Sequence, residues 1–320
     1  MNYLEQSLPN LFLTRPFVIW GFRNMSHTHG YIHANFYRVL KRNNVNVFWF
    51  DDEPDNLQRI PVGSIVLTVN IASKYLIPTP RNLYIAHNCH ESETFKEFRV
   101  SHPDRMIDWT FTQSGNTGSP AKDGSIALFD LDTRVLSQPY GTPIPIHKFK
   151  PFRDHTPKRN GIENHIGSVW NDELGRGNAE DMKELSNVLR HYGIKLRRVE
   201  LGILARTQLG QQLEMKLIRE SSLAISVHSK FQVSNGYLAC RLFKSVSLGR
   251  VPVTNQTSFN AIFGENMVGN EDIKNLVHQF MELENEELDV MNRQSQAKLA
   301  NYTYEAGLRR MELALSGGWQ

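Results

Sequence analysis

Short apolar runs, separated by turn residues and helical patterns, recur along the first half of the chain. Runs of four to six apolar residues suit strands that are buried on both faces of a parallel sheet. A helical pattern at residues 32–42 separates the first two runs, as a right-handed β-α-β unit requires. The predicted strands are residues 17–21, 45–50, 64–69, 83–86, 109–112 and 126–129.

A proline-rich segment follows these predicted strands. Proline lacks a backbone hydrogen-bond donor and breaks helices, so residues 137–164 are predicted to form an extended linker. The alternation then resumes with a strand at 166–170, a helix at 179–192 and a strand at 194–200. The prolines of the linker are Pro139, Pro143, Pro145, Pro151 and Pro157.

The pattern divides the chain into two α/β domains. We predict Rossmann-like domains at residues 1–145 and 146–320, the second ending in a helical tail at 271–315. In that tail, one long helix from about residue 285 is predicted to contain Asn301-Tyr302-Thr303-Tyr304. Two-domain dehydrogenases and periplasmic binding proteins share this plan. The sequence has no Gly-x-Gly-x-x-Gly after the first strand, no P-loop and no Gly-x-Ser-x-Gly, which disfavours nicotinamide, ATP and hydrolase chemistry.

The composition, with 40% hydrophobic and 22% charged residues, is that of a soluble globular protein. The 36 basic and 33 acidic residues give a net charge of +3 and are spread along the chain, so nucleic-acid binding is not expected. No apolar run is long enough for a membrane span, and residues 1–16 do not resemble a signal peptide. Cys89 and Cys240 cannot form a disulfide framework. With Met1 at its start, the chain is expected to be complete and cytoplasmic.

The most informative segment is residues 215–254. It predicts a helix, a strand at 223–227, a polar loop at 231–237, a helix at 238–248 and a strand at 251–254. Polar and basic groups therefore collect where strands end and a helix begins, which is where α/β sheets bind ligands. The free N–H groups and positive dipole end of a helix attract phosphate there.

This layout resembles the donor site of GT-B glycosyltransferases, and its basic helix followed by Gly249-Arg250-Val251-Pro252-Val253 is similar to that of fucosyltransferase-like members. Where many such helices carry an acidic residue, this chain has Cys240-Arg241-Leu242-Phe243-Lys244. The resemblance implies two Rossmann-like domains facing each other across a cleft. It also implies a nucleotide-diphosphate sugar as the donor, a first domain that binds the acceptor, and no required cofactor or metal.

Ten residues of the second half are candidates for binding this donor. Lys230 and the basic pair Arg241 and Lys244 can neutralise phosphate charge. Gly236 permits close approach of the backbone. Asn171 and Arg176 follow the predicted strand at 166–170. The complete set is Asn171, Arg176, His228, Lys230, Ser234, Asn235, Gly236, Tyr237, Arg241 and Lys244.

Two places in the first half offer a catalytic base. His29 follows the first predicted strand, with His27 and His33 as alternatives, and an imidazole has a pKa suited to removing a hydroxyl proton. GT-B enzymes resembling plant glucosyltransferases place a histidine in this loop. The three histidines can also suggest a zinc site, although no carboxylate lies beside them. Glu91, after the fourth predicted strand, is the second candidate base or, alternatively, a helix-capping residue.

The sequence thus predicts transfer of a hexosyl, pentosyl or fucosyl group from a nucleotide-sugar to a hydroxyl of a glycan or glycoconjugate. We expect inversion at the anomeric carbon because candidate bases exist, and no dependence on metal. One alternative is a metal-dependent GT-A-like transferase using Asp130 and Asp132, an Asp-x-Asp pair that also suits a turn. The other is a non-enzymatic two-domain protein that binds a glycan or nucleotide.

Overall fold

The computed structural model describes residues 10–25, 27–89, 92–111, 115–152 and 160–319. Contacts between Cα atoms divide it into two compact units. The first comprises Met1–Thr110, Asn116–Gln138 and Tyr304–Gln320, and the second Phe111–Gly115 and Pro139–Thr303. The chain thus leaves the first unit near the predicted linker, but residues 304–320, which the sequence-based division placed in the second domain, group with the first.

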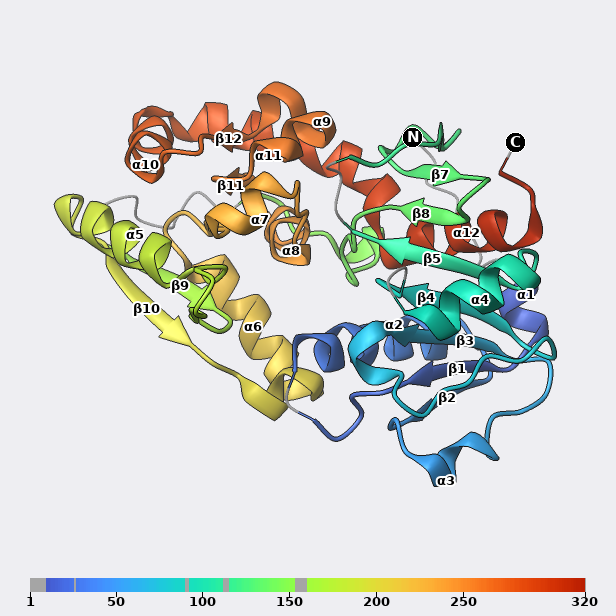
Figure 1. Ribbon diagram of the computed structural model, residues 1–320. Helices are drawn as coiled ribbons and strands as arrows, with labels where there is room; N and C mark the ends of the chain where they lie inside the picture. The colour runs from blue at the N-terminus through green and yellow to red at the C-terminus, as the bar shows by residue number, and fades with distance from the viewer. Residues whose placement is uncertain (1–9, 26, 90–91, 112–114, 153–159, 320) are drawn as a thin grey trace. The chain divides into compact units, whose positions relative to one another are not determined.

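The first unit is built on an eight-stranded sheet with the strand order β2-β1-β3-β4-β5-β8-β7-β6. The strands from β2 to β8 in this order are parallel, while β7 and β6 pair antiparallel at one edge (Figure 1). The strands are β1 (Phe17–Trp20), β2 (Val47–Phe50), β3 (Ile65–Val69), β4 (Leu83–His87), β5 (Met106–Thr110), β6 (Ser119–Pro120), β7 (Leu128–Asp130) and β8 (Val135–Ser137). Its helices are α1 (Asn10–Thr14), α2 (Thr28–Arg42), α3 (Pro54–Leu57), η1 (Asn70–Ala72), α4 (Glu93–Ser101) and α12 (Tyr304–Ser316).

Both faces of this sheet are covered, which explains the continuous apolar runs in its strands. On one face, Phe95 and Phe98 of α4 join the core formed by alternate strand residues such as Trp20 and Tyr84. On the other, Phe36 of α2 contacts the Trp109 ring edge-on, with 5.7 Å between the ring centroids. The same Phe36 ring lies 4.4 Å from that of Tyr304 in α12. The last helix is therefore part of the core of the first unit.

The second unit contains two short parallel pairs, β9 with β10 and β11 with β12. Its strands are β9 (Ile162–Ile166), β10 (Lys195–Val199), β11 (Val253–Thr254) and β12 (Val268–Gly269). Its longer helices are α5 (Ala179–His191), α6 (Gln208–Glu220), α8 (Cys240–Ser247), α10 (Ile273–Glu282) and α11 (Asn285–Leu299). Its shorter helices are η2 (Ile146–Lys148), η3 (Gly202–Arg206), α7 (Lys230–Ser234), η4 (Thr257–Phe259), α9 (Asn260–Phe263), η5 (Gly264–Asn266) and η6 (Ala300–Tyr302).

An extended segment, residues 221–227, connects the two strand pairs. Its Ser222 amide donates to the Ile162 carbonyl at 2.8 Å, and its Ser226 amide donates to the Val253 carbonyl at 2.9 Å. Its apolar residues Leu223, Ile225 and Val227 enter the core that α5 and α10 cover. The strand predicted at 223–227 is nevertheless only a single bridge at Ser226, because Ala224 has a φ of +56° and leaves the β conformation.

A buried carboxylate replaces the missing strand ladder. Glu163 of β9 accepts the backbone amides of Leu223 at 2.8 Å, Ala224 at 3.1 Å and Ile225 at 2.9 Å. The Glu163 side chain is fully buried, and its burial raises the pKa of the carboxyl group. Three backbone donors therefore find their acceptors in one side chain instead of in a neighbouring strand.

Two elements differ from the sequence prediction for identifiable reasons. The strand predicted at 166–170 is β9 at Ile162–Ile166, because the polar residues that suggested a linker are buried and hydrogen-bonded. The long last helix is broken between α11 and α12. There Thr142 donates its amide to the Tyr302 carbonyl at 2.8 Å and bridges to Thr303, so these residues bond to the chain at 142 instead of continuing a helix.

Candidate functional site

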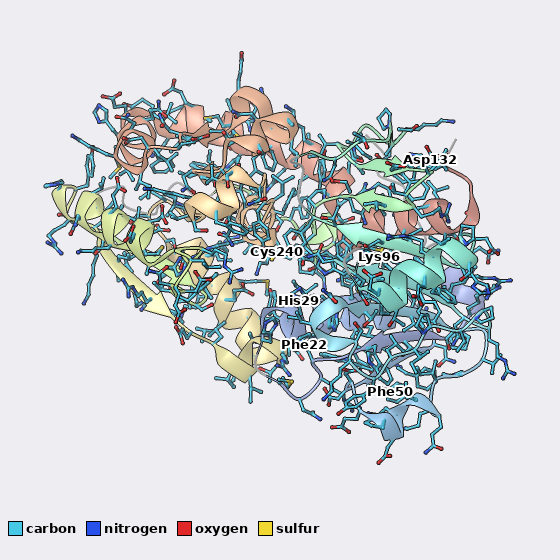
Figure 2. All side chains as sticks on the ribbon, in the orientation of Figure 1. Phe22, His29, Phe50, Lys96, Asp132 and Cys240 are labelled. Atoms are coloured by element: carbon cyan, nitrogen blue, oxygen red, sulfur yellow. The ribbon has the colours of Figure 1, made fainter. Side chains whose placement is uncertain are left out.

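In the first unit, aromatic side chains gather at the carboxyl ends of β1 and β4. His29 lies in the first turn of α2, close to Phe22 in the turn that follows β1 (Figure 2). The Phe22 ring stacks on His27, with 4.6 Å between the ring centroids, and His27 stacks on His29 at 5.1 Å. His87, the last residue of β4, approaches the His29 ring at 5.4 Å. Ligands of α/β sheets bind at this end of the strands.

The hydrogen bonds of His27 define the protonation of His29. The Nδ1 atom of His27 accepts the His29 backbone amide at 3.2 Å and lies 3.3 Å from the Nδ1 atom of His29. Since His27 Nδ1 uses its lone pair as an acceptor, a favourable contact requires the proton to be on His29 Nδ1. The Nε2 atom of His29 then carries the lone pair. It is buried and has no hydrogen-bond partner in the described part of the chain.

Burial, together with repulsion from His33 and His27, lowers the pKa of His29 to about 3. His29 is therefore neutral at physiological pH, which is the form a general base needs, although its basicity is low. The other two histidines of the motif have structural roles. His27 is the N-cap of α2, and His33 donates from Nδ1 to the Gly21 carbonyl at 3.0 Å. Glu91, the second candidate base, lies outside the described residues.

In the second unit, Arg241 holds the carboxyl end of β9. It lies in the first turn of α8 and follows Cys240, which Figure 2 labels. Its guanidinium donates from Nη1 to Nδ1 of His165 at 2.7 Å and from Nη2 to the Asn164 carbonyl at 2.8 Å. The Arg241 charge also lowers the pKa of His165, after the larger effect of burial, to about 3. His165 was not among the residues selected from the sequence, since it fell between the predicted linker at 137–164 and the strand predicted at 166–170.

His228 directly follows the extended segment 221–227, and residues at the end of β11 hold it in place. Its backbone amide donates to Oδ1 of Asn255 at 2.7 Å, and Nδ2 of Asn255 returns a bond to the His228 carbonyl at 2.8 Å. The ring is buried, with its Nδ1 atom 3.3 Å from the Thr254 hydroxyl. Burial is the main cause that lowers the pKa of His228 to about 4, and the Arg241 charge contributes. Arg241 thus interacts with both strand-end histidines.

The loop predicted at 231–237 contains α7, a five-residue helix that begins with an exposed Lys230. Ser234 and Asn235 side chains both donate to the Phe231 carbonyl, at 3.0 Å and 2.7 Å. Gly236 has a φ of +61° and ends the helix, so the structure gives it a local reason to be glycine. The Tyr237 ring lies 5.9 Å from His228, and burial raises the pKa of its phenol.

Two of the remaining donor-site candidates, Lys244 and Arg176, are paired with carboxylates. Lys244 is buried in α8 and forms a salt bridge with Glu214 of α6, which gives this lysine a structural role. Arg176 is exposed and its Nε atom donates to Oδ2 of Asp172 at 2.6 Å. Asn171 is exposed in the same loop. Of the predicted cations, Arg241 therefore has the most direct connection to strand ends.

The Asp-x-Asp pair lies at the turn between β7 and β8. Oδ1 of Asp130 accepts the amides of Asp132 and Thr133, both at 3.0 Å, and Oδ2 accepts the Thr117 hydroxyl at 3.2 Å. These bonds lower the pKa of the Asp130 carboxyl. The Asp130 side chain thus closes a hairpin turn. Over the described ranges, no group of three His, Cys, Asp or Glu residues has an arrangement suited to a metal ion.

The lowered histidine pKa values make stability dependent on pH. His29, His165 and His228 are neutral in the folded protein down to about pH 4, whereas unfolded histidine binds a proton below about pH 6.5. Because the unfolded state binds more protons in this window, stability is full above about pH 6.5 and falls as the pH decreases towards 4. We expect the midpoint of thermal unfolding to be lower at pH 5 than at pH 7.5. The change should be smaller in His228→Asn, and equal changes in both proteins would contradict this explanation.

The two α/β units and their similarity to known structures define the class of fold. The chain has the two-part α/β fold of GT-B type, as the sequence predicted. A UDP-forming α,α-trehalose-phosphate synthase from Burkholderia xenovorans is 11% identical and aligns over 95% of this chain and 99% of its own, with a TM-score of 0.50. AviGT4, a glycosyltransferase involved in avilamycin A biosynthesis, is 10% identical and aligns over 96% and 100%, also with a TM-score of 0.50. At identities this low, the structural alignments establish a shared fold alone.

Neither the protein-family models nor the curated proteins gave a match to this chain. Among the helices of the described residues, none is long and apolar enough to cross a membrane.

Proposed function

We propose that the protein is a glycosyltransferase that moves a sugar from a nucleotide-diphosphate donor to a hydroxyl of a glycan or glycoconjugate. The observation that carries the proposal is the position of Arg241. Its guanidinium joins the first turn of α8 to the carboxyl end of β9, in a unit of GT-B type. A guanidinium at this edge of a parallel sheet is suited to the charge of a diphosphate, both when the donor binds and when the nucleotide leaves.

We assign the donor to the second unit and the acceptor and its base to the first. His29 is the proposed base, with its Nε2 lone pair removing the acceptor proton as the sugar is transferred with inversion. The proposed reaction uses Arg241 instead of a divalent ion to stabilise the leaving diphosphate. We place the protein in the cytoplasm, where the thiols of Cys89 and Cys240, both free of disulfides, are stable.

A panel of nucleotide-sugars, combined with glycan acceptors, tests the function directly. We expect at least one donor to raise the midpoint of thermal unfolding and to release its nucleoside diphosphate when an acceptor is present. Activity that survives a strong chelator supports metal-independent transfer, and activity lost on chelation and restored by Mn²⁺ contradicts it. Stabilisation by a nucleotide-sugar without transfer to any acceptor, or hydrolysis, would identify a binding protein and overturn the proposed enzyme.

Replacing His29 by alanine tests the base. General base catalysis contributes about 10²–10⁴ to a rate, and a base of low pKa belongs near the lower limit, so we expect kcat to fall about 100-fold. The affinity for the nucleotide-sugar, measured by calorimetry, should stay unchanged, because His29 belongs to the first unit. His102→Ala, which removes a partly exposed histidine of the same unit, is the matched control. Full activity of the His29 variant would show that another group takes the proton.

A further inference from the structure

Two buried imidazole nitrogens of the second unit belong to histidines whose pKa values the Arg241 charge lowers. The Nε2 atoms of His165 and His228 have no hydrogen-bond partner within the part of the chain that the structure describes. Their residues are 6% and 2% exposed. A buried polar atom left unpaired is energetically unfavourable, so such atoms usually have a partner in the working protein. Two of them at neighbouring strand ends indicate a ligand.

The neighbours of His165 define it as a hydrogen-bond donor. Arginine can only donate, so Nδ1 of His165 must accept the bond from Nη1 of Arg241 at 2.7 Å. His165 is neutral, since burial and the Arg241 charge lower its pKa to about 3. Its single ring proton is therefore on Nε2. This N–H is directed to the turn after β9. The Ser168 backbone there raises the pKa of His165 slightly but forms no hydrogen bond of acceptable geometry with Nε2. A Cβ at Gly167 would lie 4.0 Å from Nε2 and meet no other neighbouring atom within 4 Å.

The neighbours of His228 define its Nε2 atom as a hydrogen-bond acceptor, the opposite of the role of Nε2 in His165. The Thr254 hydroxyl donates its single proton to the Ser226 carbonyl at 2.7 Å, so it can only accept from Nδ1 of His228, 3.3 Å away. The ring proton of His228 is therefore on Nδ1. Its neutral Nε2 atom presents a lone pair. The two strand-end histidines consequently offer one donor and one acceptor, although they are the same type of residue.

We infer that His165 and His228 bind different groups of one ligand: His165 donates a hydrogen bond from Nε2 to a phosphate oxygen, and Nε2 of His228 accepts a hydrogen bond from a hydroxyl or N–H group of the same ligand. The phosphate belongs on the His165 side because Arg241 adds a positive charge there. It is excluded from Nε2 of His228, because a lone pair repels an anionic oxygen. This inference rests on the proposed function for the identity of the ligand as a nucleotide-diphosphate sugar.

Binding of three probes of increasing complexity tests the assignment: inorganic pyrophosphate, UDP and UDP-glucose, with GDP, ADP and GDP-mannose as alternatives if the uridine compounds do not bind. His165→Leu should weaken all binding probes about 10- to 100-fold, as expected for a lost bond to a charged group. His165→Gln keeps an N–H donor and should recover most of the loss. His228→Leu should leave pyrophosphate affinity unchanged and weaken a nucleotide or nucleotide-sugar about 3- to 10-fold.

The simplest probe that His228→Leu weakens identifies the ligand group that donates a hydrogen bond to Nε2 of His228. If the affinity for the nucleoside diphosphate is already lower, the donor group belongs to the nucleoside. If only the affinity for the nucleotide-sugar is lower, the donor group belongs to the sugar. Nitrogen-15 NMR of labelled histidine gives an independent measurement, with His165 expected as the Nε2–H tautomer and His228 as the Nδ1–H tautomer. Binding should shift the Nε2 resonance of each.

Several outcomes overturn the inference. Unchanged affinity for every probe in His165→Leu would do so, as would an equal loss of pyrophosphate and nucleotide-sugar binding in a folded His228→Leu protein. The opposite tautomers, or failure of all probes to bind the wild-type chain, would also end it. Failure of the proposed function gives a different result, in which the probes bind with the expected dependence on His165 but no sugar is transferred to any acceptor.

Discussion

Arg241→Ala is expected to reduce the affinity for a nucleotide-diphosphate sugar by at least about 100-fold, since bonds between charged groups contribute about 1.5–3 kcal/mol each. The guanidinium would be lost as a phosphate partner, and Nδ1 of His165 and the Asn164 carbonyl would lose their donor. Without Arg241, His165 is also no longer constrained to carry its proton on Nε2. Calorimetry with the donor identified in the panel measures the change.

The control variants separate charge from geometry. Arg241→Lys keeps a positive charge but cannot donate to His165 and Asn164 in the same fork, so we expect an intermediate affinity. Arg190→Ala removes an exposed arginine at the end of α5 in the same unit and should have no effect. A folded Arg241→Ala protein with the affinity of the wild type would remove the central support for the donor site.

Replacing Glu163 by leucine is expected to cause the largest loss of stability. The change leaves the amides of Leu223, Ala224 and Ile225 without acceptors in the core, at about 1–3 kcal/mol for each. We expect the second unit to lose about 3–5 kcal/mol, and Glu163→Gln to be damaging as well because its amide group presents N–H donors to backbone N–H groups. Hydrogen exchange at residues 223–225 and urea unfolding measure the effect.

Glu184→Leu is the matched control, since Glu184 is exposed on α5 of the same unit. Its stability should stay within about 0.5 kcal/mol of the wild type. Because two compact units need not unfold together, the exchange of individual amides is more informative than one global transition. Slow exchange at 223–225 in Glu163→Leu would show that these amides do not depend on the carboxylate.

The sequence predicts the first unit well because its strands obey a simple rule. Apolar runs such as residues 17–20 are buried on both faces, and helices lie between them, so hydrophobicity alone locates them. At the antiparallel edge, the strand predicted at 126–129 overlaps β7, whereas β6 was not predicted, because its two residues are too few for a periodic pattern.

The second unit is harder to predict because polar side chains complete its core. Glu163 and Asn164 fell in the predicted linker and His165 directly after it, yet all three lie in β9, are buried and form hydrogen bonds. Their partners, the 223–225 amides, the Leu217 carbonyl and Arg241, are more than 50 residues away in sequence. Secondary-structure propensity depends on neighbouring residues in the sequence, so it cannot predict such long-range pairings. The histidine most closely joined to Arg241 was therefore missed, although Arg241 itself was selected.

The grouping of α12 with the first unit has a consequence for how the chain is assembled. The Tyr304 ring packs on Phe36, and Arg310 donates from Nε to Gln138 at 2.7 Å and from Nη1 to Asp123 at 2.7 Å. During synthesis, the sheet strands emerge from the ribosome first but must wait for this helix to cover one of their faces. Residues 139–303 are meanwhile inserted as a continuous block that can fold earlier. The first unit can therefore be completed only after residues 304–316 have been made.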